Sequence, residues 1–305
     1  MSLPELNGLI AAAHSPFDAQ GALNVAAVAH QARLFREMGL IGVFVGGSTG
    51  EWFSLSQDER QALTEAWVEA AGELVVIAHV GGVSVEQAQA LASHAQATGV
   101  DAISCLVQPE LRVQTAAGAV DYLEAVASAA PTTSAFYYDM AALTGIDVPL
   151  DVLLDVAIDR VPTLAGAKYT NADLATLTRA QQVSRDLQIL MGRDEMLFEA
   201  LTLGVKGAVG STYNYAAPIY GRIRDAVARE DVEAARAANM EVARFVKALH
   251  QTGVLSGAKA IMGWMGVDVG KPRPPHDTLD ATAAAAFHAA ISDMQIFARP
   301  LPPCP

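Results

Sequence analysis

Apolar runs of strand length recur eight times between residues 8 and 210 of this 305-residue chain. They cover residues 8–13, 41–46, 74–80, 102–107, 133–138, 164–168, 188–191 and 207–210. Amphipathic or alanine-rich stretches long enough for helices separate them, at residues 24–38, 57–71, 85–97, 115–130, 150–158, 171–184 and 195–203. Strands that alternate with helices form parallel βαβ units. Eight such units predict an α/β fold of the (β/α)8 TIM-barrel type.

The rest of the chain reads as an extension of this barrel. The length allows either one barrel or two domains, but no low-complexity linker divides the sequence. We assign residues 1–215 to the barrel strands and crossover helices. Residues 216–305 read as additional C-terminal helices that end in a proline-rich tail, with a loop at residues 271–275. We expect the extension to pack on the barrel as part of the same structural unit.

The composition narrows the classes of function. With 52% hydrophobic residues the chain can bury a large core, and its net charge of −13 offers no Lys/Arg-rich surface for nucleic acid or an anionic membrane. Cys105 and Cys304 are the only cysteines, too few for a disulfide framework or a thiolate metal cage. No stretch reads as a signal peptide or a membrane span. We therefore expect a cytoplasmic protein whose partners include neither nucleic acid nor membrane.

Lys168 is the first lysine of the chain, and all the Lys and Arg positions before it are arginine. It ends the apolar run at residues 164–168. Arginine stays protonated in proteins, whereas a lysine held in a dry, apolar place can lose its proton and attack a carbonyl. Position alone also allows a lysine whose stem packs at a strand end while its ammonium reaches water. Its neighbours must therefore decide between the two interpretations.

Polar clusters follow five of the predicted strands. They are Gly46-Gly-Ser-Thr-Gly-Glu51, Tyr137-Tyr138, Lys168-Tyr-Thr170, Gly192-Arg-Asp-Glu195 and Gly210-Ser-Thr-Tyr213. In a TIM barrel the active site lies at the C-terminal ends of the strands, so all five clusters are expected at one rim. Alternation along a strand points only one of the two tyrosines inward. This shared rim favours a functional role for Lys168.

A lysine at the mouth of a barrel suits covalent catalysis on a ketone. Burial in an apolar site disfavours the ammonium and frees an amine that can form a Schiff base. The resulting iminium is an electron sink, so the chemistry needs no metal or other cofactor, and the sequence contains no zinc-binding His or Cys pattern. Tyr138 is the best candidate to relay protons to and from a substrate hydroxyl.

These residues also resemble a known family, the pyruvate-dependent lyases and synthases grouped with N-acetylneuraminate lyase and dihydrodipicolinate synthase. The shared motifs are Gly46-Gly-Ser-Thr-Gly-Glu51, Ile77-Ala-His-Val-Gly81, Tyr138 with Leu143-Thr-Gly145, Gly166-Ala-Lys-Tyr-Thr170, Gly192-Arg-Asp-Glu195 and Gly207-Ala-Val-Gly-Ser-Thr-Tyr-Asn-Tyr215. The resemblance implies that Lys168 forms a Schiff base with pyruvate and that Tyr138 relays protons. It implies that Ser48 and Thr49 bind the pyruvate carboxylate, and that the protein is a homotetramer.

Three places in the sequence resemble the sialic acid lyases more than the synthases of that family. Ser48 stands where the synthases usually have a second threonine, and Leu143 stands where they have an arginine for a substrate carboxylate. Asp194, Glu195 and Ser211 match residues that bind the hydroxyl tail of the sugar in the lyases. The resemblance therefore implies reversible cleavage of N-acetylneuraminate to N-acetylmannosamine and pyruvate. The expected substrate site is completed by Thr170, Gly192 and Gly210.

Two segments depart from the family pattern. Residues 109–112 read Pro-Glu-Leu-Arg, where many members have a tyrosine that reaches a neighbouring subunit's site. Tyr138-Asp-Met-Ala141 replaces the family's Tyr-Asn-Ile-Pro. The substrate therefore stays open, and another 2-keto acid lyase, synthase or dehydratase of the family is one alternative. A non-catalytic barrel that binds a sugar acid is another. We interpret His79 as a neutral core histidine bonded to a backbone carbonyl.

Overall fold

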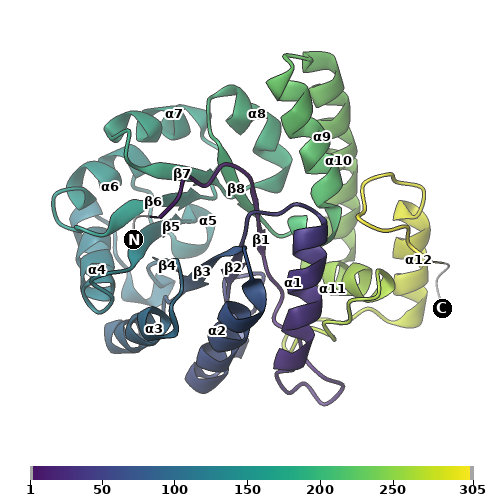
Figure 1. Ribbon diagram of the computed structural model, residues 1–305, viewed down its shortest axis with the longest axis horizontal. Helices are drawn as coiled ribbons and strands as arrows, with labels where there is room; N and C mark the ends of the chain where they lie inside the picture. The colour runs from purple at the N-terminus through teal and green to yellow at the C-terminus, as the bar shows by residue number, and fades with distance from the viewer. Residues whose placement is uncertain (1–2, 303–305) are drawn as a thin grey trace.

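The computed structural model describes residues 3–302, and within them eight parallel strands close into a barrel (Figure 1). The strands are β1 Leu9–Ala12, β2 Gly42–Val45, β3 Val75–His79, β4 Ala102–Cys105, β5 Ser134–Asp139, β6 Leu164–Tyr169, β7 Gln188–Met191 and β8 Gly207–Gly210. Each pairs in parallel with the next, and β8 returns to β1 with Ala208 opposite Leu9. The predicted barrel and all eight of its strands are confirmed; β5 is shifted by one residue toward the C-terminus, and β6 ends one residue later than expected.

Helices surround the barrel (Figure 1). They are α1 Val28–Glu37, α2 Gln57–Ala71, α3 Val85–Thr98, α4 Ala116–Ser128, α6 Leu150–Ala157, α7 Leu174–Val183, α8 Leu197–Thr202 and α9 Tyr213–Ala228. The short elements α5 Ala141–Thr144, η1 Val25–Ala27, η2 Trp52–Ser54, η3 Pro109–Leu111 and η4 Asp194–Met196 occupy the loops. Side-chain caps explain where several helices begin, as at Ser56, whose hydroxyl accepts the Glu59 amide while the Glu59 side chain accepts the Ser56 amide.

The C-terminal extension adds α10 Val232–Thr252, α11 Val254–Trp264 and α12 Ala281–Ile291. In Figure 1, α10 lies along α9, and α11 and α12 follow on the same side of the barrel. Residues 271–275 form part of the loop between α11 and α12, as the sequence predicts. The predicted boundary at residue 215 falls inside α9, which packs against β1 and β8. No helix within residues 3–302 is long and apolar enough to cross a membrane.

Strand alternation produces two separate cores. One fills the barrel interior and includes Ile10, Phe44 and Tyr138. The other lies between strands and helices and includes Tyr137 and Tyr169. Since successive side chains point to opposite faces of a sheet, Tyr138 turns inward and Tyr137 outward, as the alternation predicts.

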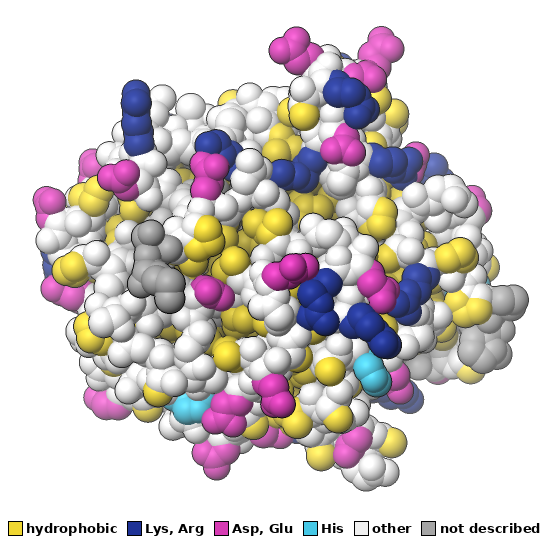
Figure 2. Space-filling model, in the orientation of Figure 1, with side chains coloured by type: hydrophobic (Ala, Val, Ile, Leu, Met, Phe, Trp, Pro, Cys, Tyr) yellow, Lys and Arg dark blue, Asp and Glu magenta, His cyan; other side chains and the backbone are white. Residues whose placement is uncertain are grey.

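The segment before β1 crosses one end of the barrel, in front of β7 and β8 in Figure 1. The Leu6 amide donates to Gln188 Oε1 at 2.7 Å, and the Leu6 side chain packs into the interior core. The strands begin at the end of the barrel that this segment covers. The end at which the strands finish is therefore open for a site. On the face in Figure 2, which has the same orientation, basic side chains lie scattered among acidic ones.

Candidate active site

Lys168 lies inside the barrel with its side chain among aromatic rings. Its neighbours Ala167 and Tyr169 belong to the outer core, so alternation turns Lys168 inward. The Nζ atom lies 4.0 Å from the ring centroid of Tyr138 and 4.3 Å from that of Phe44, and the residue is only 5% exposed. No carboxylate of residues 3–302 lies within 4.0 Å of Nζ. The amine is therefore held by aromatic faces rather than by an ion pair.

Tyr138 stands directly opposite Lys168, because β5 and β6 pair in that register. Its ring makes edge contacts with Phe44 and His79 at centroid distances of 5.6 and 6.0 Å. Its hydroxyl donates to Met140 Sδ at 3.4 Å. A thioether is a weak acceptor, so this phenol can exchange its partner for a substrate hydroxyl at little cost.

His79 behaves as the core histidine that the sequence suggests. Burial and the nearby cations Arg60 and Lys168 hold the pKa of His79 well below its usual range, so the ring is neutral. Its Nδ1 lies 3.0 Å from the carbonyl oxygen of Gly46, to which a neutral ring can donate. This bond ties the end of β3 to the turn after β2.

Two of the predicted site hydroxyls are buried without a hydrogen-bond partner. They are Ser48 Oγ, in the turn after β2, and Thr170 Oγ1, directly after β6; among the described residues neither has a partner. Thr49, next to Ser48, is half-buried. Native proteins pair nearly all buried polar atoms, so unpaired hydroxyls at a barrel mouth are suited to receive a ligand.

Two glycines allow close approaches at this rim. A Cβ atom on Gly192 would lie 2.1 Å from Thr170 Oγ1, and one on Gly210 would lie 2.5 Å from Asp194 Oδ1. Burial raises the pKa of Asp194, although Oδ2 accepts bonds from the Thr212 amide at 2.7 Å and the Thr212 hydroxyl at 2.5 Å. One oxygen of Asp194 is thus used within the protein, and Oδ1 is left for a ligand.

Glu195 and Ser211 complete the rim on the side of β7 and β8. Glu195 Oε1 lies 2.6 Å from Arg193 Nη2, and both side chains are partly exposed. The Ser211 carbonyl accepts from the Asn214 side chain at 2.8 Å. The structure brings Asp194, Glu195 and Ser211 to the same end of the barrel as Lys168. Within residues 3–302 no hydrogen bond joins these three to Lys168 or Tyr138.

The turn after β5 is held in a way that the sequence did not reveal. The Ala141 amide donates to Asn171 Oδ1 at 3.1 Å, a bond that a proline at position 141 has no N–H to make. Burial raises the pKa of Asp139 to about 6, opposed by a bond from Asn171. Asn171 therefore replaces the rigidity that a proline supplies.

Sequence reasoning also missed a buried ion pair beside the rim. Glu51 Oε1 lies 2.6 Å from Lys259 Nζ, with side chains 0% and 1% exposed. The available signal was a lysine inside the apolar stretch at residues 255–262, in a chain that uses lysine rarely. Glu51 directly follows Ser48-Thr49-Gly50, so the pair adjoins the predicted carboxylate site.

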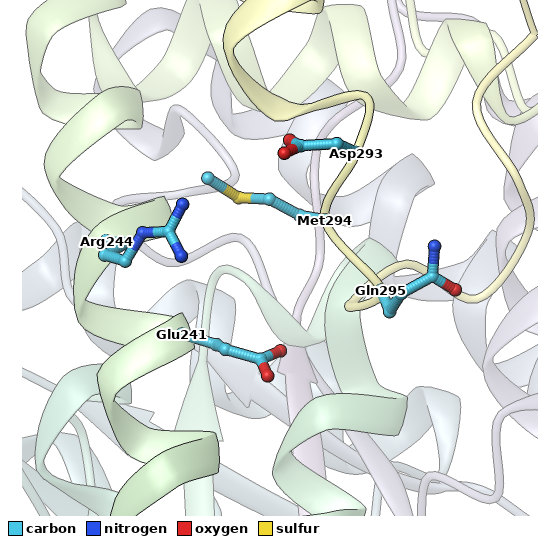
Figure 3. Close-up of a pocket in the computed structure, with 5 residues that line it drawn as sticks. All are labelled: Glu241, Arg244, Asp293, Met294 and Gln295. Carbon is cyan, nitrogen blue, oxygen red and sulfur yellow. The ribbon is translucent and has the colours of Figure 1, made fainter.

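In the described part of the chain, Cys105, possible metal ligands and the pocket on the C-terminal extension do not add to this site. Burial raises the pKa of the free Cys105 thiol to about 12, which leaves it protonated, and Cys304 lies outside the described residues. No group of three or more His, Cys, Asp or Glu residues within residues 3–302 is placed to hold a metal ion. The pocket in Figure 3 lies on the C-terminal extension, and none of its lining residues is a predicted site residue. Those residues are Glu241, Arg244, Asp293, Met294 and Gln295.

Known proteins resemble this chain over nearly its full length. The dihydrodipicolinate synthetase family matches residues 5–294. The chain is 33% identical to the N-acetylneuraminate lyase of Mus musculus, over 98% of this chain and 97% of that protein. It is 35% identical to the N-acetylneuraminate lyase of Homo sapiens, over 90% of this chain and 89% of that protein.

The solved structures agree with this assignment. The Proteus mirabilis N-acetylneuraminate lyase superposes with a TM-score of 0.93 at 31% identity, covering 96% of this chain and 100% of that one. The sialic acid aldolase of Aliivibrio salmonicida gives the same TM-score at 30% identity, covering 96% of this chain and 98% of that one. With a family match over nearly its full length, a shared barrel and a lysine at the end of β6, the chain belongs to the dihydrodipicolinate synthetase family.

Proposed function

We propose that this protein is a class I aldolase that reversibly cleaves N-acetylneuraminate to N-acetylmannosamine and pyruvate. The proposal is supported by the family and by relatives named N-acetylneuraminate lyase. One observation carries it: Lys168 Nζ lies 4.0 Å from the ring of Tyr138, inside the barrel at the end where the strands finish. Schiff-base cleavage requires such an amine with a proton-transferring group beside it.

In the proposed reaction the Lys168 amine attacks the ketone carbon of the open-chain sugar acid and expels water, leaving a protonated imine. The carbon–carbon bond one carbon away then breaks, and its electron pair is stored in an enamine. Tyr138 relays the proton released by the hydroxyl whose carbon becomes the aldehyde, and this proton finally reaches the enamine carbon. Water hydrolyses the imine, which releases pyruvate and restores the amine.

The neighbouring groups suit the two ends of this substrate. Ser48 and Thr49, which follow β2, supply hydroxyl donors for the carboxylate of the keto acid. Thr170 supplies a third hydroxyl beside Lys168. On the other side, Asp194 Oδ1, Glu195 and Ser211 are suited to the sugar hydroxyls, because carboxylates accept several O–H donors.

Borohydride trapping with pyruvate tests the covalent step. The reductant converts an imine to a stable amine, so we expect the mass of a reduced pyruvate adduct on the peptide containing Lys168. Lys168→Arg should give no adduct and no cleavage, because a guanidinium cannot form the imine. Lys206→Arg, at an exposed lysine, is the matched control, and this variant should still form the adduct and cleave the substrate. A folded wild-type protein without an adduct, or cleavage by Lys168→Arg, would contradict the proposal.

A second candidate is cleavage of a different 2-keto-3-deoxy sugar acid by the same chemistry. It is favoured by the segment Tyr138-Asp-Met-Ala141, which departs from the family pattern Tyr-Asn-Ile-Pro beside the proposed proton relay and is held by Asn171. Pyruvate release from a panel of sialic acids and 2-keto-3-deoxy sugar acids separates the two candidates. The highest kcat/KM with N-acetylneuraminate supports the first one.

We also infer that no metal or other cofactor is required and that the protein works in the cytoplasm as a homotetramer. The iminium itself supplies the electron sink. Exposed apolar side chains on four successive loops after β2 to β5 favour association: Phe53, Val83, Leu111 and Leu143. Sedimentation velocity should give four times the 31.9 kDa of one chain, and a monomer mass would contradict the tetramer.

A further inference from the structure

The buried carboxylate of Glu51 is held entirely by the C-terminal extension. Its Oε1 lies 2.6 Å from Lys259 Nζ in α11, and its Oε2 accepts the amide of Arg273 at 2.9 Å. Arg273 lies in the loop after α11. The proposed chemistry uses neither Glu51 nor Lys259. A buried ion pair of this kind is costly unless its charges are well matched, so it calls for an explanation.

Lys259 also joins the loops that follow β1 and β2. Its Nζ donates to the Ser15 carbonyl at 2.9 Å and lies 4.2 Å from the ring centroid of Phe17. The Ser15 hydroxyl in turn donates to the Gly50 carbonyl at 2.5 Å. Burial lowers the pKa of Lys259, and the Glu51 carboxylate opposes that shift. The Lys259 ammonium therefore contacts Glu51, which follows Gly50, and Ser15, whose hydroxyl binds the Gly50 carbonyl.

The backbone of Glu51 is strained. Its φ of 54° and ψ of 37° place it in the left-handed region, which disfavours residues other than glycine. It shares a tight turn with the carboxylate-binding hydroxyls, because the Glu51 amide donates to the Ser48 carbonyl at 3.1 Å. Such a conformation persists only where surrounding contacts hold it. Beyond the hydrogen bonds of the turn itself, the contacts that hold the Glu51 side chain are those made by Lys259 and Arg273.

We infer that Glu51 is a positioning residue, whose ion pair with Lys259 holds the Ser48–Thr49 turn in the shape that receives the substrate carboxylate. The extension thereby shapes a site whose reacting groups all lie on the barrel. The carboxylate as ligand rests on the proposed function, whereas the effect of the ion pair on the turn does not.

Two double variants separate the ion pair from the strain. Lys259→Met with Glu51→Ala removes both charges, so no lone buried charge remains, and leaves a residue that resists the left-handed region. Lys259→Met with Glu51→Gly removes the same charges but adopts that region freely. The difference between the two reports on the shape of the turn rather than on the lost charges.

Amide hydrogen exchange of residues 47–54, without substrate, is the first measurement. We expect exchange in the alanine variant to rise about tenfold, the factor that corresponds to about 1.4 kcal/mol. The glycine variant should lie closer to the wild type, and strand β7 should be unchanged in both. Unchanged exchange in the alanine variant would overturn the inference, as would equal exchange in the two variants.

The second measurement is KM for pyruvate in condensation with N-acetylmannosamine. We expect KM for pyruvate to rise about tenfold in the alanine variant and to recover in the glycine variant, with smaller changes in kcat and in KM for the sugar. A fall in kcat alone would contradict a positioning role. Absence of turnover by the wild type would instead contradict the proposed function, and hydrogen exchange would still decide the inference.

Lys259→Met with Glu51→Gln serves if the other two double variants do not fold. It removes both charges while keeping the shape of the Glu51 side chain and an acceptor for the Arg273 amide. We expect a smaller rise in exchange at residues 47–54 and in KM for pyruvate. No change in either quantity would overturn the inference.

Discussion

At the scale of single residues, the contact between Lys168 and Tyr138 follows from strand register and alternation. Both side chains occupy inward positions directly across β5 and β6, which brings the amine over the phenol ring. Packing and chemistry can therefore be separated at Tyr138, because its ring holds Lys168 and only its hydroxyl is proposed to move protons.

We expect Tyr138→Phe to keep imine formation and to slow carbon–carbon cleavage by about 10²- to 10⁴-fold, the range typical of a lost general acid or base. Borohydride trapping and steady-state cleavage measure the two steps on one sample. Tyr137→Phe is the matched control, because that side chain lies in the outer core. Wild-type turnover in Tyr138→Phe would remove the assigned relay.

Gly192 is expected to be necessary for the position of Thr170. A methyl group at Gly192 would lie 2.1 Å from Thr170 Oγ1, so Gly192→Ala must displace that hydroxyl. We expect kcat/KM to fall about tenfold or more, as for misplaced active-site groups. Gly221→Ala, in α9, is the control: nothing lies within 4 Å of the added carbon, and alanine favours a helix. Equal kinetics for the two variants would contradict this role.

At the scale of elements, local sequence predicts the helices but not the side-chain links that join one element to another. The capping box at Ser56 and Glu59 marks the start of α2 at its predicted residue. The helix predicted at residues 195–203 instead starts at Leu197, after the turn η4. The Asp194 carboxylate in that turn binds Thr212, just before α9. This link between two elements leaves no local signal.

We expect Thr212→Val to reduce the free energy of unfolding by about 1–3 kcal/mol, because the Tyr220 hydroxyl loses its partner and the buried Asp194 keeps only the bond from the backbone amide of residue 212. Since Asp194 is proposed to bind the sugar, KM for N-acetylmannosamine should rise more than KM for pyruvate. Urea unfolding and condensation kinetics measure the two effects. Thr178→Val, which removes a hydroxyl bond within α7, is the control. An unchanged free energy of unfolding would contradict the structural part of this role.

At the scale of the whole molecule, the C-terminal extension is proposed to be part of the barrel's folding unit. Phe245 of α10 packs against Tyr215 at a centroid distance of 5.9 Å, and Lys259 of α11 neutralises the buried Glu51. A chain that ends at residue 228 loses both contacts and leaves Glu51 as a lone buried charge, which is strongly destabilising.

We therefore expect the shortened chain to lose its near-ultraviolet circular dichroism and its cooperative thermal transition, whereas the full chain unfolds in one step. The full chain, measured in parallel, is the reference. A shortened chain with an intact cooperative transition would show that the extension is a separate unit.

The sequence by itself determined the barrel, its eight strands and the rim on which Lys168 and Tyr138 meet. Apolar runs and helical periodicity are local signals, and a closed parallel barrel places every strand end at the same face. The lysine, the tyrosine and the hydroxyls after β2 could therefore be placed together without coordinates.

Only the tertiary structure decided which polar groups are already engaged. Asp194 gives one oxygen to Thr212, Glu195 pairs with Arg193, and Glu51 finds its cation near the other end of the chain. The pairs Asp194–Thr212 and Glu51–Lys259 are formed by the packing of the barrel and of the extension, so the spacing of residues in the sequence does not predict them. For this reason the chemistry could be predicted from sequence, whereas the contacts that support the Ser48–Thr49 turn could not.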